Sequence, residues 1–157
     1  MDFDWIITGR LLLSAALGAL LGAERDLHAR PAGTRTGLVI AVGACLFGIL
    51  SSEGYADAEG TQDPTRIASI VVPGIGFIGA GVLLKGEDKI VGMTTAASIW
   101  LAAGVGLAVG AGMPELAVSA TLLALVALPL LDPLSRRLTA IGERRMRRQG
   151  RTVVHEG

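Results

Sequence analysis

Five apolar stretches, separated by short polar segments, run through this sequence of 157 residues. They are Trp5–Ala23, Gly37–Ser52, Ile67–Leu84, Val91–Met113 and Leu116–Leu131. About 20 helical residues, each rising about 1.5 Å, are needed to cross the hydrocarbon core of a bilayer. The pattern therefore predicts an all-α, polytopic membrane protein with about five transmembrane helices.

The third stretch combines a membrane-spanning length with residues that destabilise helices in water. Its uncharged run lies between Arg66 and Lys85. The interior contains Pro73, Gly74, Gly76, Gly79 and Gly81. In lipid, such residues are tolerated where neighbouring helices pack closely or bond the freed backbone groups. We expect the four glycines to form a helix-packing centre, in a helix that is either closely packed or broken at the proline.

The composition agrees with helices that pack closely in lipid. Hydrophobic residues make up 51% of the chain, aromatic residues make up only 4%, and there are 22 glycines. Ala, Gly, Leu and Val suit close helix contacts in a membrane. The net charge of zero gives no basic field that would attract nucleic acid, and the single cysteine, Cys45, excludes an intrachain disulfide.

The charges in the connecting segments predict the orientation. Twelve of the fourteen basic residues follow the first, third or fifth stretch, whereas the other connections are acidic. By the positive-inside rule, the amino terminus is outside and the carboxy terminus is cytoplasmic. A rival interpretation takes Leu11–Ala23 as a cleaved signal peptide, but it would place Arg25, Arg30 and Arg35 outside. We expect a transmembrane domain over 1–133 and a basic cytoplasmic tail over 134–157.

Small residues recur at every fourth position in three stripes. The stripes are Gly18 and Gly22; Gly33, Gly37, Ala41 and Cys45; and Ala102, Gly106 and Gly110. Such stripes let helix backbones approach, either within one chain or between two copies in a homodimer. Segments 31–36 and 90–95 also resemble each other loosely, which indicates either a parallel repeat of helix pairs 1-2 and 3-4 or chance similarity.

Charged residues lie in or beside the first two spans. Arg10 is costly in a membrane unless it is paired, so it either bonds Glu53, Glu59 or Asp63 or extends to the outer headgroups. At the cytoplasmic side, the first span ends at Glu24 and Arg25, and the second begins at Arg35 and Thr36. Asp26 follows Arg25, so a carboxylate at this edge can pair with Arg35 and staple the two helices. Alternatively, this carboxylate joins a cation site with the backbone carbonyls that end the first helix.

Polar residues also flank the third and fourth spans. Asp63 is expected to cap a helix that starts just before Arg66. Thr94 and Thr95 either bond helix carbonyls or line a polar groove beside residues 74–81. Trp100 lies too deep for an interfacial anchor, so we expect it to fill space against glycines.

The tail from Ser135 to Arg151 is strongly basic, with Leu134, Leu138 and Ile141 at helical spacing. This pattern is typical of an amphipathic helix on an anionic leaflet. Alternatively, the basic cluster only fixes the orientation of the chain.

No pattern of catalysis is present in the sequence. A Ser-His-Asp arrangement and a phosphate-binding loop are both absent, and His28 and His155 are far apart. No acidic cluster lies inside a span to remove the water shell of Mg²⁺, which dehydrates reluctantly. We therefore expect no enzyme activity and no cofactor, and we assign no metal site.

Six segments resemble the MgtC/SapB family of bacterial inner-membrane proteins. In order, they are residues 10–13, 18–25, 32–36, Asp63 with residues 66–68, then residues 74–81 and 92–100. The resemblance covers about residues 5–130 and is specific only as a set. It implies a multi-pass, hydrophobic amino-terminal domain of about five spans in the inner membrane. Many members carry a carboxy-terminal ACT-type domain, which we do not expect here because the sequence stops after the basic tail.

The resemblance also implies a function. Members of the family are linked to growth at low Mg²⁺ and to stress adaptation, and some are linked to survival of pathogens inside host cells. The role attached to them is regulation through membrane partners such as the ATP synthase or Mg²⁺ transporters. We expect a non-enzymatic regulator that forms a homodimer or contacts such a partner. The alternative is a transporter or channel for Mg²⁺ or another small solute, and a third hypothesis is a groove that binds lipid.

Overall fold

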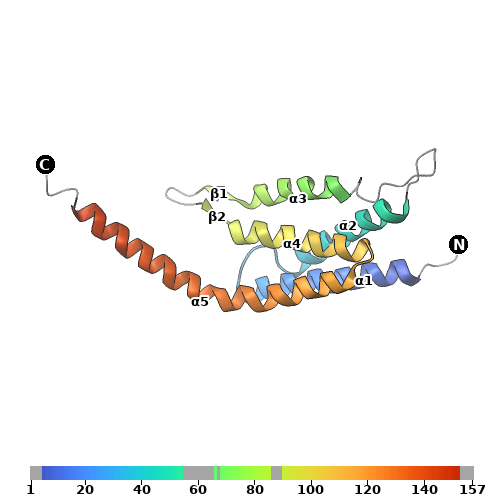
Figure 1. The fold of residues 1–157 in the computed structure, drawn as a ribbon, viewed down its shortest axis with the longest axis horizontal. Helices are drawn as coiled ribbons and strands as arrows, with labels where there is room; N and C mark the ends of the chain where they lie inside the picture. The colour runs from blue at the N-terminus through green and yellow to red at the C-terminus, as the bar shows by residue number, and fades with distance from the viewer. Residues whose placement is uncertain (1–4, 55–65, 67, 86–89, 153–157) are drawn as a thin grey trace. The chain divides into compact units, whose positions relative to one another are not determined.

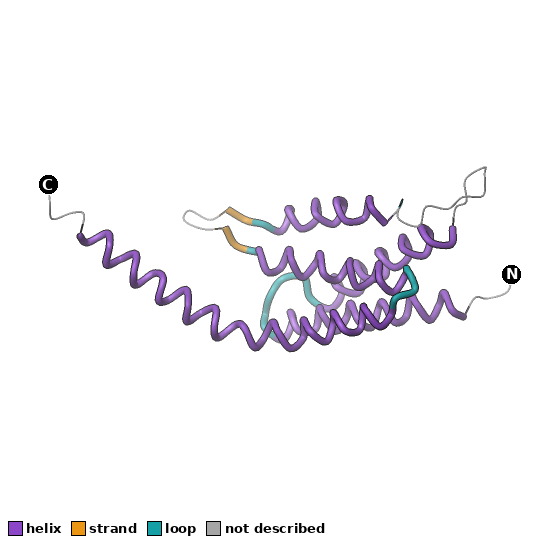
Figure 2. The backbone as a smooth tube through the Cα atoms, viewed as in Figure 1, coloured by secondary structure: helices purple, strands orange, loops and turns teal. Residues whose placement is uncertain are grey.

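The computed structural model describes residues 5–54, 66, 68–85 and 90–152. Within them, the chain forms five α-helices, which confirms the predicted all-α class (Figure 1). They are α1 Trp5–Leu27, α2 Thr34–Ile49, α3 Ala68–Val82, α4 Met93–Gly110 and α5 Pro114–Thr152. A π-helical turn, Leu50–Gly54, follows α2, and two short strands, β1 Leu84–Lys85 and β2 Ile90–Val91, precede α4 (Figure 2).

Four of the described helices are long and apolar enough to cross a membrane. These segments are Trp5–Leu27, Thr34–Glu53, Met93–Gly110 and Pro114–Pro133. The polytopic membrane architecture is therefore confirmed, while the orientation and the internal repeat stay predictions. The third helix is shorter than predicted. Its 15 residues extend only about 22 Å, which is less than a hydrocarbon core of about 30 Å.

Pro73 lies inside α3, which continues through it as one helix. Its missing N–H removes the hydrogen bond to the carbonyl four residues before it, but the helix continues on both sides of the proline. The alternative of a helix broken at Pro73 is therefore wrong.

The short strands, which the apolar pattern did not reveal, connect α3 to α4. Leu84 lies opposite Val91 in this antiparallel pair, and Lys85 lies opposite Ile90. Gly92 then precedes α4 with a φ of +93°, and a Cβ at this position would lie 2.5 Å from the Val82 carbonyl oxygen. Only glycine fits this conformation and this close approach of the two helix ends.

Helix α2 packs on both α1 and α4, whereas α3 packs mainly on α4. A Cβ at Gly18 or Gly37 would overlap the other residue's carbonyl oxygen, and a Cβ at Gly106 would overlap that of Ala41. The three small-residue stripes therefore pack against one another inside a single chain. We call this contact the glycine seam; it comprises Gly18, Gly22, Gly33, Gly37, Ala41, Cys45, Gly106 and Gly110.

The chain divides into two parts, Met1–Leu122 and Leu123–Gly157, and α5 runs through both. In the first part, Ala117 and Thr121 are buried, and Thr121 Oγ1 donates to the Ala117 carbonyl oxygen at 2.9 Å. In the second part, the helix continues to Thr152 across the predicted boundary between residues 133 and 134.

Candidate functional site

A buried guanidinium lies where α1 ends. Arg25 is only 1% exposed, and its Nη2 donates to Oγ1 of Thr95 on α4 at 2.8 Å. Thr95 is also buried. A buried charge is costly unless it is hydrogen-bonded, so this contact fixes the end of α1 against the start of α4. The structure thus brings together two residues that were separate candidates in the sequence.

Glu24 is also buried, but its carboxylate bonds away from the second helix. His28 Nδ1 lies 3.0 Å from Glu24 Oε1 and 2.8 Å from the Glu24 carbonyl oxygen. Among the described residues, Glu24 Oε2 is buried without a hydrogen-bond partner. The predicted ion pair with Arg35 is wrong, because Arg35 is exposed on α2 and the Glu24 carboxylate lies beside His28, the residue just after α1.

A carboxylate does staple α1 to α2, but it is that of Asp26 and its partner is Thr34 rather than Arg35. Asp26 Oδ2 accepts hydrogen bonds from the Thr34 backbone N–H at 2.8 Å and from Thr34 Oγ1 at 2.7 Å. The end of α1 therefore caps the first turn of α2, and a Cβ at Gly33 would overlap the Asp26 carboxylate. The sequence signal was an acidic residue eight positions before a threonine, which is too common to be distinctive.

A small cavity lies beside Arg25, between α1, α2 and α4. Its volume of about 10 Å³ suits about one water molecule. Thr36 and Ser98 line it, and Ser98 Oγ donates to the carbonyl oxygen of Thr94, whose side chain is exposed. We call the polar residues around this end of α1 the Arg25 cluster; they are Glu24, Arg25, His28, Thr36, Thr95 and Ser98.

A second polar contact lies near the opposite end of α1. Arg10 forms an ion pair with Glu53, which lies in the π-helical turn after α2. Arg10 Nη1 is also 3.4 Å from the carbonyl oxygen of Gly110, where α4 ends. Glu53 was one of three predicted acidic partners, and the other two, Glu59 and Asp63, lie outside the described residues. Arg10 therefore ties together the ends of α1, α2 and α4.

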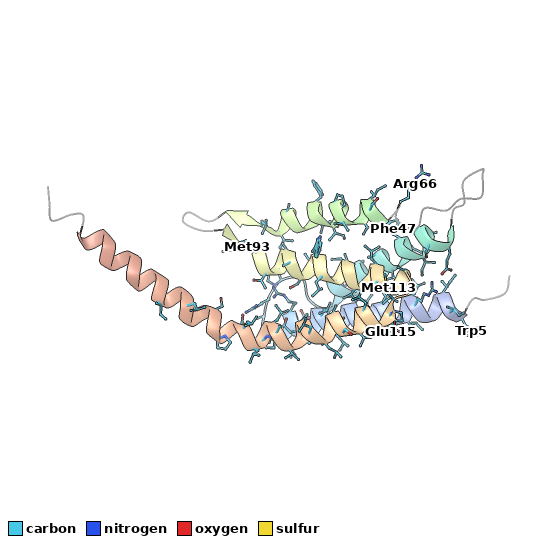
Figure 3. All side chains as sticks on the ribbon, viewed as in Figure 1. Trp5, Phe47, Arg66, Met93, Met113 and Glu115 are labelled. Carbon is cyan, nitrogen blue, oxygen red and sulfur yellow. The ribbon has the colours of Figure 1, made fainter. Side chains whose placement is uncertain are left out.

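The remaining polar candidate before α3 is peripheral. The side chain of Arg66 is exposed and points away from the helices (Figure 3). Its carbonyl oxygen accepts a hydrogen bond from Ser69 Oγ at 2.9 Å, close to the start of α3. The predicted cap at Asp63 lies outside the described residues.

The glycines of α3 differ from those of the seam. A Cβ at Gly74, Gly76 or Gly81 would meet no atom within 4 Å, whereas one at Gly79 would lie 3.6 Å from Ala96 Cβ on α4. A packing role for the three open glycines stays a prediction that requires a second molecule. Trp100 is 55% exposed, so it does not fill space inside the bundle as expected.

An apolar groove of about 470 Å³ separates α2 from α3. Gly43 on α2 and Gly74 on α3 line its two walls, and neither would meet another atom if it carried a Cβ. Other lining residues are apolar and include the exposed side chains of Phe47, Ile70 and Ile78. The groove is therefore apolar and open to a large group, whereas the cavity beside Arg25 is small and has a few polar residues in a mainly apolar lining.

Cation ligands are not clustered in the described residues. No group of three or more His, Cys, Asp or Glu side chains there is placed to hold a metal ion. Glu24 and His28 are the pair that comes closest to such a group, because a carboxylate and an imidazole lie 3.0 Å apart.

Comparison with known proteins identifies a family whose members this chain resembles. The MgtC family model matches residues 11–137. YhiD of Escherichia coli, whose name presents it as a candidate magnesium transporter, is 42% identical over 88% of this chain and 65% of its own length. MgtC of Salmonella typhimurium is 41% identical over 91% of this chain and 61% of its own length.

A third relative, an uncharacterized protein of Haemophilus influenzae, is 42% identical over 96% of this chain and 66% of its own length. The chain thus spans less than two thirds of each of these relatives. No solved structure matches it.

Proposed function

The chain belongs to the MgtC family, and from this premise we propose that it is a non-enzymatic regulator in the bacterial inner membrane. In this proposal it supports magnesium homeostasis during Mg²⁺ limitation by contacting other membrane proteins. The names of its relatives, a candidate magnesium transporter and MgtC, support the link to magnesium.

The groove between α2 and α3 is the observation that carries the regulatory role. Its facing glycines, Gly43 and Gly74, leave room for another helix to approach the backbone on both walls. In lipid, helices associate through close packing at such small residues, because hydrocarbon tails offer no hydrophobic drive between helices. A transmembrane helix of a partner complex, or of a second copy in a homodimer, therefore fits the groove.

A substitution pair tests this role. We expect Gly74→Leu to abolish both growth at limiting Mg²⁺ and capture of a membrane partner in a cross-linked pull-down, because leucine fills the groove. Gly104→Leu is the matched control, since Gly104 on α4 is equally open but lies outside the groove. The regulator proposal fails if a stably folded Gly74→Leu protein retains growth and partner capture.

A transporter or channel is the second candidate. The buried Glu24 carboxylate favours it, because its Oε2 has no partner among the described residues and carboxylate oxygen is a preferred Mg²⁺ ligand. Mg²⁺ usually retains several waters, however, and the neighbouring cavity suits about one water molecule. Passage would therefore require the helices around Arg25 to separate.

Flux measurements distinguish the two candidates. Purified protein in liposomes with an internal Mg²⁺ indicator is expected to show no saturable flux if the protein is only a regulator. Selective, saturable Mg²⁺ flux that disappears in Glu24→Gln would instead establish transport.

A further inference from the structure

Helix α5 continues well beyond the segment that can cross a membrane. The apolar segment ends at Pro133, while the helix continues to Thr152. Residues 134–152 therefore extend about 28 Å as a helix. Neither the family resemblance nor the proposed regulatory role explains this extension.

The extension carries an apolar stripe. Leu134, Leu138 and Ile141 are spaced by four and three residues, so they lie on one helix face. Leu138 is 59% exposed and Ile141 is 63% exposed. Exposed leucine and isoleucine at helical spacing indicate a face that requires an apolar surface.

A basic stripe runs beside the apolar one. The segment 134–152 contains seven arginines, no lysine and a single acidic residue, Glu143. Four of the arginines recur at helical spacing: Arg137, Arg144, Arg148 and Arg151. The helical repeat places this stripe about 80° around the helix from Leu134, Leu138 and Ile141. Arginine binds phosphate oxygens with two parallel N–H donors, which lysine cannot do.

We propose that residues 134–152 lie along an anionic lipid surface, with the apolar stripe between the headgroups and the arginine stripe bound to lipid phosphates. Charge complementarity identifies the occupant, because a polybasic amphipathic helix next to a membrane span is attracted to acidic lipids. A second copy fits less well, since pairing through this face would bring two arginine stripes together. Pro129 and Pro133 each remove a backbone hydrogen bond, which permits the bend into the surface.

Labelled full-length chain in lipid nanodiscs tests the proposal. With Cys45 replaced by alanine, single cysteines at Leu138 and, as the control, at Glu143 on another face carry an environment-sensitive fluorophore. The discs contain either phosphatidylcholine alone or a mixture with phosphatidylglycerol. We expect the label at 138 to report an apolar environment and to be quenched by a lipid-linked quencher only in anionic discs. The label at 143 stays in water.

Substitution of the arginine stripe provides the charge control. Replacing Arg137, Arg144, Arg148 and Arg151 by glutamine is expected to lower the ratio of bound to released helix about fivefold per residue. Replacing the same four residues by lysine keeps the charge but loses the paired N–H donors, so it is expected to weaken binding less than glutamine does. The proposal is overturned if the label at 138 stays in water in anionic discs. It is equally overturned if protection at 138 persists without phosphatidylglycerol and after the glutamine changes, because a protein contact then covers the stripe.

Discussion

Helices α2 and α3 are both apolar and glycine-rich, yet their glycines have different surroundings. In α2, Gly37 lies directly against the backbone of α1, and the carbonyl oxygen of Ala41 lies where a Cβ of Gly106 would be. In α3, Gly74 and Gly81 face open space. The spacing of glycines thus indicates that a helix can accept a close neighbour, without indicating whether the same chain supplies it.

Polar contacts reinforce this difference. Arg25 bonds Thr95 near one end of the α1–α2–α4 bundle, and Arg10 contacts Glu53 and Gly110 at the other. The described polar side chain of α3, Ser69, bonds only the carbonyl oxygen of Arg66, which precedes the helix. Helix α3 is therefore held to the bundle mainly by apolar contact with α4 and by the β1–β2 connection.

The largest expected effect comes from filling the glycine seam. Gly37→Leu should destabilise the protein by at least about 3 kcal/mol, because its side chain would overlap the α1 backbone. Thermal unfolding in detergent measures this loss, with Gly104→Leu as the matched change at an open position. Equal stability of the two variants would remove the distinction between seam and open glycines.

A smaller loss is expected from removing the buried acceptor of Arg25. Thr95→Val should cost about 1–3 kcal/mol, because the Arg25 guanidinium loses a hydrogen bond in a buried site. Thr95→Ser should retain most of the stability, since its hydroxyl can accept the same bond. If the Thr95→Val and Thr95→Ser proteins have equal stability, the Arg25–Thr95 contact does not hold α1 against α4.

The α3–α4 contact should be less sensitive. We expect Gly79→Leu to cost about 1–2 kcal/mol, since a Cβ there reaches Ala96 at an ordinary contact distance but a larger side chain does not fit freely. Leu83→Ala should cost less, because Leu83 is 40% exposed. The same unfolding assay compares them, and a larger loss for Leu83→Ala would locate the main α3 contact elsewhere.

The ion pair between Arg10 and Glu53, near the other end of α1, should contribute still less to the free energy of unfolding. A double-mutant cycle of Arg10→Ala and Glu53→Ala is expected to give a coupling free energy of about 0.5–1 kcal/mol, because both side chains are partly exposed. A coupling of zero would mean that Arg10 is satisfied by lipid headgroups instead.

The smallest effect on folding is expected at the open glycine of the groove. Gly74→Leu should leave the unfolding temperature unchanged or raise it slightly, because leucine favours helix and meets no atom of the chain. Loss of function without loss of stability would then distinguish the role of the open glycine in α3 from the folding role of the seam glycine in α2. Unfolding comparable to that of Gly37→Leu would contradict the open face.

Hydrophobic patterning predicted the helices and the small-residue stripes because both repeat along the sequence. It did not assign the stripes, since Gly106 meets Ala41 across a distance in sequence that no local pattern encodes. The Arg25–Thr95 bond was missed for the same reason, because 70 positions separate its residues. Thr34 was missed as the partner of Asp26 because a threonine eight positions after an acidic residue is too common to be distinctive. The sequence did not reveal that α3 ends at Val82, because the two leucines that follow continue the apolar run whether they lie in a helix or in a strand.

The glycine seam also has a consequence in time. The α1 side of α2 can be covered as soon as both helices are made, because Gly18 and Gly37 are near in sequence. The side of α2 that contacts α4 can be covered only after Gly106 has been synthesised, which is 65 residues after Ala41. At about 5–20 residues per second, this delay is about 3–13 seconds. During it, the carbonyl-lined face of α2 lies open in the membrane, where any other helix with a glycine stripe can compete for it.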